Sequence, residues 1–291
     1  MNTTTIWLFI IIVSNAGGQG KTTLARLLKA LFEINGAPVQ LLDADAGNSA
    51  AMIVDPTSAK VGWGVQSVVN PDIVRAYSGK HVILDLGANT MASAREIADA
   101  IPDLIREFEN AGYHSLALLP VTPNKPGAAD AVVKLGGQLP AENKWLVLND
   151  SDGTGNFEKG EFPFPIAKLE HLMPGLVAYV NATSSRSFGD AAVSPSDDQQ
   201  IAARHIAKWM GDFAKQLPFQ EIFAQSARVL DQIPSPAKTM FRVTAPELTK
   251  DTVMASYERR SVIFTGLNKY GWHAAGLRRV AEQLEQSATQ T

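Results

Sequence analysis

A short glycine-rich stretch near the start of the chain, GGQGKTT at residues 17–23, carries groups that together could bind a chain of phosphates. Its glycines let the backbone fold tightly, so that successive N–H groups can point at phosphate oxygens. The helical pattern that follows would add the positive end of its dipole. Lys21 could place its ammonium group between the β- and γ-phosphates, Thr22 could offer its hydroxyl to Mg²⁺, and Thr23 could bind the α-phosphate. The stretch therefore predicts a nucleotide site, against the alternative of a glycine-rich turn that only caps a helix.

Aspartates follow two of the apolar runs that are typical of buried β-strands. Asp43 and Asp45 come after the second such run, and Asp85 ends the third. A carboxylate at a strand end can orient an attacking water or reach Mg²⁺. We expect Asp45 to orient the water, and Asp43 and Asp85 to face the metal. Two alternatives stay open: Asp43 could cap the next segment, and Asp85 could only form a turn.

Other polar residues of predicted loops could serve the same ligand. Asn149 ends an apolar run and carries both a donor and an acceptor, which suits the edge of a purine base. A local turn with Asp150 is the alternative. Lys125 and Arg186 could meet phosphates, although most such side chains are simply solvated. The five histidines show no spacing typical of a zinc site, so we expect no zinc.

Apolar runs alternate with helical patterns along the chain, as expected for a parallel sheet covered on both faces. The polar groups above follow the carboxyl ends of the strands, where ligands bind in such sheets. We therefore predict an α/β fold with three layers, a mostly parallel sheet flanked by helices on both faces, as in P-loop NTPases. The predicted strands are 6–13, 39–42, 81–86, 115–119 and 145–148, and the predicted helices are 22–35, 70–77, 92–110, 128–135, 201–213 and 219–230.

The helix at 22–35 has the clearest pattern, because one face is apolar and Gly36 stands where a C-terminal cap belongs. Trp209 and Phe213, four residues apart, are expected in the core. The apolar face of the first helix consists of Leu24, Leu27, Leu28, Leu31 and Phe32. The less regular segments are expected to be an irregular stretch at 55–66, an interruption of the helix 92–110 near Pro102, a surface loop at 151–160, a strand at 176–180, and a loop at 181–199 that leads into a helix.

The two prolines at 234 and 236 punctuate the chain, so we expect a nucleotide-binding domain at 1–232 and a partly helical extension at 233–291. The 291 residues are 45% hydrophobic and 19% charged, with a net charge of −3, which gives no global reason to bind nucleic acid or an acidic membrane. The absence of cysteine excludes disulfides and thiolate chemistry. The run at 6–13 is too short to cross a bilayer and lacks the basic flank of a signal peptide. We therefore expect a cytoplasmic protein with no integral membrane association.

These motifs together resemble those of the ParA/MinD group of partition and division-site ATPases, which have a deviant Walker A loop, K-G-G-x-G-K-[ST]-[ST]. The group's D-x-D-P-Q-G-N stretch is similar to residues 43–48, its strand-end aspartate to Asp85, and its base-reading asparagine to Asn149. The resemblance covers residues 6 to about 230 and implies ATP or ADP and Mg²⁺ as cofactors. Asn15, which stands where a simple P-loop has glycine, then belongs to a loop that turns on its paired glycines. The implied phosphate-binding residues are Gly17, Gly18, Gln19, Gly20, Lys21, Thr22 and Thr23.

The chain departs from this group at Ala16, where the group has a lysine that crosses to the partner subunit's nucleotide when two protomers sandwich ATP. Alanine brings no charge there. Nucleotide binding survives, because Lys21 and the backbone amides perform it. Hydrolysis would then be slow, another cation would substitute, or the dimer would differ. Loss of a cation that stabilises the transition state can lower the rate by ~10³–10⁵.

The resemblance implies an ATP-dependent switch: a weak ATPase and nucleotide-dependent homodimer that acts in plasmid or DNA segregation, or positions a protein complex. DNA or a DNA-bound adaptor protein is the expected partner. The basic pairs 259–260 and 278–279 are candidate DNA contacts, with solvated helix faces as the alternative. Two other classes stay open: a small-molecule kinase or ATP-dependent ligase on a similar fold, and a nucleotide-binding partner protein with no useful turnover.

Overall fold

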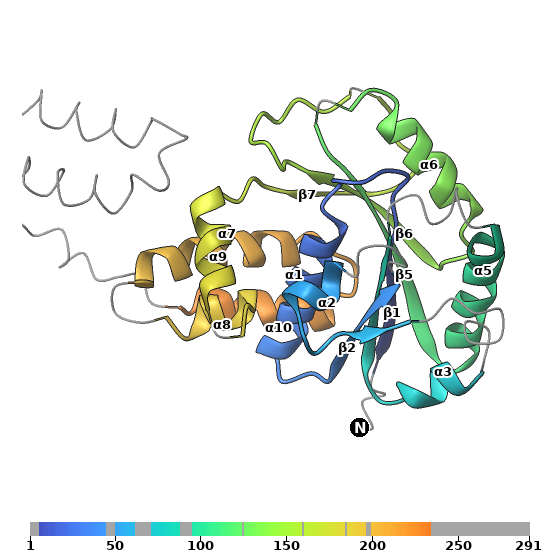
Figure 1. The fold of residues 1–291 in the computed structure, drawn as a ribbon, viewed down its shortest axis with the longest axis horizontal. Helices are drawn as coiled ribbons and strands as arrows, with labels where there is room; N and C mark the ends of the chain where they lie inside the picture. The colour runs from blue at the N-terminus through green and yellow to red at the C-terminus, as the bar shows by residue number, and fades with distance from the viewer. Residues whose placement is uncertain are drawn as a thin grey trace, which may run out of the picture. The chain divides into compact units, whose positions relative to one another are not determined.

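A seven-stranded sheet forms the centre of the protein, with the strand order β3-β2-β4-β1-β5-β6-β7 and every neighbouring pair parallel (Figure 1). The computed structural model describes residues 6–44, 50–61, 71–87, 95–123, 125–158, 160–183, 185–195 and 199–233. The predicted parallel α/β fold is confirmed. The strands are β1 (Trp7–Ile12), β2 (Val39–Ala44), β3 (Ala59–Lys60), β4 (His81–Leu86), β5 (Tyr113–Val121), β6 (Asn143–Asn149) and β7 (Ile166–Leu169).

Helices cover both faces of the sheet (Figure 1). Alternate residues of the central strand β1 enter the two cores: Ile10 faces the layer that holds α1, and Ile11 faces the opposite layer. The first layer contains α1 (Lys21–Ile34), α2 (Ala50–Val54), α7 (Pro174–Ala182), α8 (Phe188–Val193), α9 (Gln200–Ala214) and α10 (Gln220–Asp231). The second contains α3 (Pro71–Ala76), α5 (Arg95–Asn110) and α6 (Ala128–Gln138). This arrangement confirms the three predicted layers.

The first helix has the structure that its sequence pattern predicts. All five residues of its apolar face are buried, and Gly36 follows the helix with a φ of 67°, its N–H donating to the Glu33 carbonyl at 2.9 Å. Glycine accepts this left-handed conformation without strain. Trp209 and Phe213 are also in the core, as predicted. A helix buried this deeply gives the loop before it a rigid support.

Prolines break fewer elements than predicted. The helix α5 continues through Pro102, because Ile101, Leu104 and Ile105 on its inner face are buried against the sheet. That burial offsets the hydrogen bond that proline cannot donate. The predicted interruption is therefore wrong. Likewise β5 includes Pro120 and extends to Val121.

The predicted strand at 176–180 is wrong, because these residues lie within the helix α7. A short apolar run does not distinguish a strand from a buried helix by periodicity, and Pro174, in the first turn of α7, is the signal that favours the helix. The seventh strand is instead β7, which the sequence analysis missed. Its four residues alternate between exposed and buried, a pattern too short to recognise without the rest of the sheet.

Two further helices lie in segments predicted to be loops or left unassigned. The helix α8 interrupts the predicted loop at 181–199, and its cap was readable in the sequence: Ser187 precedes it, Asp190 follows three residues later, and the Ser187 hydroxyl accepts from the Gly189 N–H at 3.1 Å. The short helix α2 was not predicted. The stretch at 55–66 is not wholly irregular, since it contains β3, while residues 62–66 lie outside the described part of the chain.

The chain divides into two compact units, residues 1–233 and 234–291. The second unit lies outside the described residues, so the predicted extension, its helical end and its two basic pairs stay predictions. Within the part of the chain that the structure describes, none of the helices has the length and apolar content that crossing a membrane requires.

A buried histidine ties the amino ends of the two central strands together. His81 begins β4, is 4% exposed, and accepts from the Leu8 N–H through Nδ1 at 3.2 Å. Its ring stacks on Phe32 with centroids 4.2 Å apart. Burial lowers the pKa of His81 from 6.5 to about 4, because an imidazolium loses its hydration in the core.

This histidine predicts a specific loss of stability in acid. The unfolded chain takes up a proton near pH 6.5 whereas the folded chain does so only near 4, so the contribution is complete above pH 6.5 and is lost as the pH falls to 4. The loss amounts to about 3 kcal/mol. In His81→Asn, which keeps an acceptor but does not titrate, the free energy of unfolding should fall less over this range in urea titrations. The exposed His205→Asn is the control, and equal pH slopes in all three proteins would contradict the assignment.

Candidate functional site

The glycine loop lies between β1 and α1, at the carboxyl edge of the sheet. Asp85 is paired in register with Ile12 of β1 on one side and with Asp43 of β2 on the other. Thr122 directly follows β5, the strand next to β1, and Asn149 is the last residue of β6, the strand after that. The structure thus brings the predicted residues Asp43, Asp85 and Asn149 to one edge, together with Thr122. Asp45, predicted to orient a water, lies outside the described residues.

The loop turns at Gly18 and Gly20, which have φ values of 70° and 81°. The sequence predicts the turn at Gly17 and Gly18, whereas the positive φ values fall at Gly18 and Gly20. At Gly20 a side chain would also have no room, because an added Cβ would lie 2.1 Å from Nδ2 of Asn149. Glycine is therefore required at this position for both its conformation and its size.

Lys21 folds back over the loop. Its Nζ donates to Ser14 Oγ at 3.0 Å and to the Ala16 carbonyl at 3.2 Å, and the Ser14 hydroxyl also donates to that carbonyl at 2.9 Å. The side chain is 8% exposed. The ammonium group thus lies against neutral oxygens of the loop, where the stronger attraction of a phosphate oxygen could replace them. Ser14 was not foreseen, because a serine shortly after a strand has no distinctive sequence signal.

The hydroxyl of Thr22 and the carboxylate of Asp85 meet beside the loop, with Oγ1 donating to Oδ2 at 2.8 Å. Asp85 is buried, at 4% exposed. Hard oxygen groups of this kind are the ligands that Mg²⁺ prefers, usually together with phosphate oxygens and water. The pair fits a magnesium ion that a nucleotide would bring, and Thr22 and Asp85 would face it.

Asp43 caps the next segment, as the alternative interpretation of the sequence predicted. Its Oδ2 accepts from the Met52 N–H at 3.0 Å, in the first turn of α2. The carboxylate is buried, at 1% exposed, and caps that turn in this structure. A role at the metal stays a prediction for Asp43.

Two side-chain amides hold the loop in place. Oε1 of the fully buried Gln19 accepts from both the N–H and the hydroxyl of Thr122, at 2.7 and 2.9 Å. Nδ2 of Asn149 donates to the Gln19 carbonyl at 3.0 Å. Gln19 was predicted only as a nucleotide contact, and its side chain is here an anchor. The recognition of a base by Asn149 stays a prediction.

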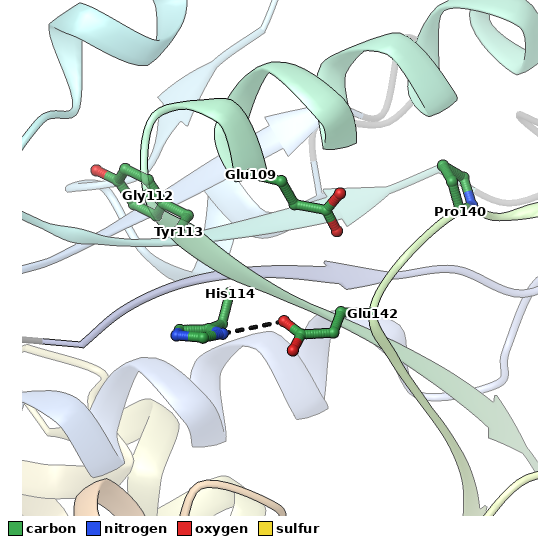
Figure 2. Close-up of a pocket in the computed structure, with 6 residues that line it drawn as sticks. All are labelled: Glu109, Gly112, Tyr113, His114, Pro140 and Glu142. Atoms are coloured by element: carbon green, nitrogen blue, oxygen red, sulfur yellow. Dashed lines mark hydrogen bonds and ion pairs between the residues drawn. The ribbon is translucent and has the colours of Figure 1, made fainter.

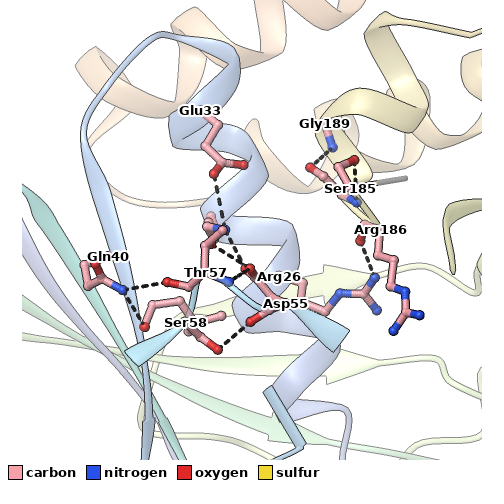
Figure 3. A network of polar contacts seen from close by, with 12 residues as sticks. Arg26, Glu33, Gln40, Asp55, Thr57, Ser58, Ser185, Arg186 and Gly189 are labelled. Carbon is pink, nitrogen blue, oxygen red and sulfur yellow. Dashed lines mark hydrogen bonds and ion pairs between the residues drawn. The ribbon is translucent and has the colours of Figure 1, made fainter. Parts of the chain in front are cut away.

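The two loop cations have different surroundings. Lys125 Nζ donates to the Gly17 carbonyl at 2.8 Å. Arg186 lies in the polar network of Figure 3, where its Nη1 donates to the Ile53 carbonyl at the end of α2 and its own carbonyl accepts from Arg26. Burial lowers the pKa of the Arg26 guanidinium below its usual range, because the charged form loses hydration. Of these two side-chain hydrogen bonds, the one from Lys125 reaches the glycine loop and the one from Arg186 reaches α2.

A pocket also opens at the opposite edge of the sheet, near the amino ends of β5 and β6 (Figure 2). Its lining includes Glu109, His114 and Glu142, and His114 Nδ1 lies 3.0 Å from Glu142 Oε2. None of the predicted site residues lines this pocket. It is therefore separate from the glycine loop.

Comparison with known proteins agrees with this geometry. A family model described as the CobQ/CobB/MinD/ParA nucleotide-binding domain matches residues 10–287. The chain belongs to this family. The match confirms the resemblance that the motifs indicated, and it extends past residue 230, where that resemblance was expected to end. No relative is found among curated protein sequences.

Solved structures similar to this member of the CobQ/CobB/MinD/ParA family are distant. MinD from Pyrococcus horikoshii with Mg-ADP has 15% identity and a TM-score of 0.42, over 79% of this chain and 97% of that one. The MinC:MinD complex of Aquifex aeolicus has 15% identity and a TM-score of 0.44, over 70% and 94%. FtsY from Elizabethkingia anophelis with GDP has 14% identity and a TM-score of 0.41, and the match spans 57% of each chain.

The contact between Gly20 and Asn149 can be tested by stability. Gly20→Ala should lower the free energy of unfolding by at least ~2 kcal/mol, because the methyl group meets Asn149 and the backbone is left-handed. Gly137→Ala, in an open position of α6, should be neutral or stabilising by ~0.5–1 kcal/mol. In an Asn149→Ala background, Gly20→Ala should cost less by ~1 kcal/mol or more, as measured by urea unfolding. Strictly additive effects would contradict the contact.

Proposed function

We propose that this protein is an ATP-dependent switch that binds ATP with Mg²⁺ and hydrolyses it slowly to ADP and phosphate. The observation that carries the proposal is the position of Lys21, whose ammonium group donates to the Ala16 carbonyl and the Ser14 hydroxyl of the loop, while the next residue, Thr22, donates to Asp85. Loop, cation and oxygen ligands thus occupy one edge of the sheet. Family membership supports nucleotide binding, and the choice of ATP rests on the motif resemblance and on Asn149.

The residues of the chain would divide the work as follows. Lys21 would move from the Ala16 carbonyl to the β- and γ-phosphate oxygens, and the loop amides would bind the rest of the phosphate chain. Bound Mg²⁺ would neutralise charge that develops on the phosphates. Thr22 and Asp85, with Asp43 on the neighbouring strand, would face the Mg²⁺ ion. Asp45 would orient the attacking water.

As a switch, the protein would form a homodimer with ATP and separate after hydrolysis or release. Its cargo would be DNA, such as a plasmid, or a protein complex that it positions, with DNA or a DNA-bound adaptor as partner. These proposals, and a cytoplasmic location, rest on the motif resemblance and on the family to which the chain belongs.

Substitution of Lys21 tests the nucleotide site directly. Lys21→Ala should weaken Mg-ATP binding at least about tenfold in calorimetry, because one charge-assisted hydrogen bond to phosphate is lost. Lys134→Ala, which removes an exposed lysine of α6, is the control. Circular dichroism of both variants should match the wild type. Equal affinities in all three proteins, or no affinity of the wild type for ATP or ADP, would refute the site.

The oligomeric state tests the switch. Light scattering should give the mass of a dimer with Mg-ATP and the mass of a monomer with ADP or with EDTA, with and without DNA. Phosphate release should be slow and should rise with DNA or the partner protein. The same mass in every nucleotide state would contradict a dimer switch. Rapid transfer of the phosphoryl group to a metabolite would instead indicate a kinase.

A further inference from the structure

We infer that Lys125 is a second phosphate-binding cation of the glycine loop, supplied by the segment after β5 of the same chain. The inference rests on the proposed function, since it requires that the loop hold the polyphosphate of a nucleotide. It assigns to Lys125 a direct contact with that polyphosphate.

Lys125 approaches the loop at two adjacent glycines, Gly17 and Gly18. Its Nζ lies 2.8 Å from the Gly17 carbonyl oxygen and would lie only 3.3 Å from a Cβ added to Gly18. Lys21 holds the preceding carbonyl, that of Ala16, from inside the loop. Two ammonium groups thus contact consecutive carbonyls of a segment whose own residues 15–20 carry no charge.

The segment that carries Lys125 is held at both ends. Thr122 is bound through its N–H and hydroxyl to Gln19, inside the glycine loop itself. At the other end, the Gly127 N–H donates to Glu158 Oε1 at 2.6 Å, and the Ala128 N–H donates to the Lys125 carbonyl at 3.1 Å. Hydrogen bonds therefore hold the chain on both sides of Lys125, and a turn of its side chain would bring the ammonium group to a phosphate.

A phosphate would be a better partner for this ammonium group than the present one. The Gly17 carbonyl is neutral, whereas hydrogen bonds between two charged groups are shorter and roughly twice as strong. The flexible stem of a lysine allows the group to turn from a carbonyl to a nearby anion. Gly18 has no side chain to obstruct that movement. A polyphosphate in the loop would attract both ammonium groups.

The competing view is that Lys125 is a surface lysine that only holds the loop in shape. The two views predict different nucleotide affinities for variants that keep or lose the positive charge of Lys125. Lys125→Gln can still donate to the Gly17 carbonyl but carries no charge, whereas Lys125→Arg keeps the charge. Lys134→Gln removes an exposed lysine on the neighbouring helix α6 and serves as the matched control.

The experiment is calorimetric titration of the full-length protein with Mg-ATP at two salt concentrations. We expect the dissociation constant of Lys125→Gln to rise about tenfold with a weaker salt dependence, Lys125→Arg to stay within about threefold of wild type, and Lys134→Gln to match it. Melting temperatures should be equal. In the wild type, Mg-ATP should also protect Lys125 from acetylation by acetic anhydride, read by mass spectrometry.

The outcomes distinguish the two levels of the proposal. If the wild type binds Mg-ATP but Lys125→Gln binds as tightly as Lys134→Gln, or Mg-ATP leaves the acetylation of Lys125 unchanged, this inference is overturned and the nucleotide site stands. If Lys125→Arg loses as much affinity as Lys125→Gln, a structural role replaces the inferred one. If the wild type binds no nucleotide, the proposed function fails first.

Discussion

The shape of the phosphate loop depends on the buried carboxamide of Gln19, because a segment made largely of glycine has few side chains with which to anchor itself. One oxygen of Gln19 accepts two hydrogen bonds from Thr122, and Asn149 binds the Gln19 backbone. These bonds are buried, where an unpaired donor would cost ~1–3 kcal/mol. The loop conformation is therefore coupled to the ends of β5 and β6 through hydrogen bonds within the protein.

The strand order divides the site into two halves around β1. On one side, β4 and β2 bring the carboxylates of Asp85 and Asp43, the first of which meets Thr22. On the other side, β5 and β6 end in uncharged groups that hold the loop, followed by Lys125. In the proposed site the first half would face the metal and the second half would face the phosphate chain. The parallel sheet brings the two halves together because every strand presents its carboxyl end at the same edge.

Local chemistry made much of this fold predictable. The glycine loop, the helix after it and the strand-end aspartate are continuous stretches whose neighbours in sequence are also their neighbours in space. Residues 176–180 could not be assigned that way, because a short apolar run suits a strand and a buried helix equally and only its packing decides. The bonds from Gln19 to Thr122 and from Lys125 to Gly17 each join positions more than a hundred residues apart. No sequence period reports such contacts.

Because Lys125 belongs to the same chain as the loop, it does not couple nucleotide binding to dimerisation in the proposed switch. A lysine that crosses from a partner subunit contacts the nucleotide only in the dimer, so it makes binding and dimerisation favour each other. Lys125 contacts its own chain's loop in the monomer as well. It therefore strengthens nucleotide binding in both states by a similar amount, and a ligand contact that is equal in two states shifts no equilibrium between them. Any preference of the dimer for ATP must then come from groups other than Lys125, at surfaces that the second subunit covers.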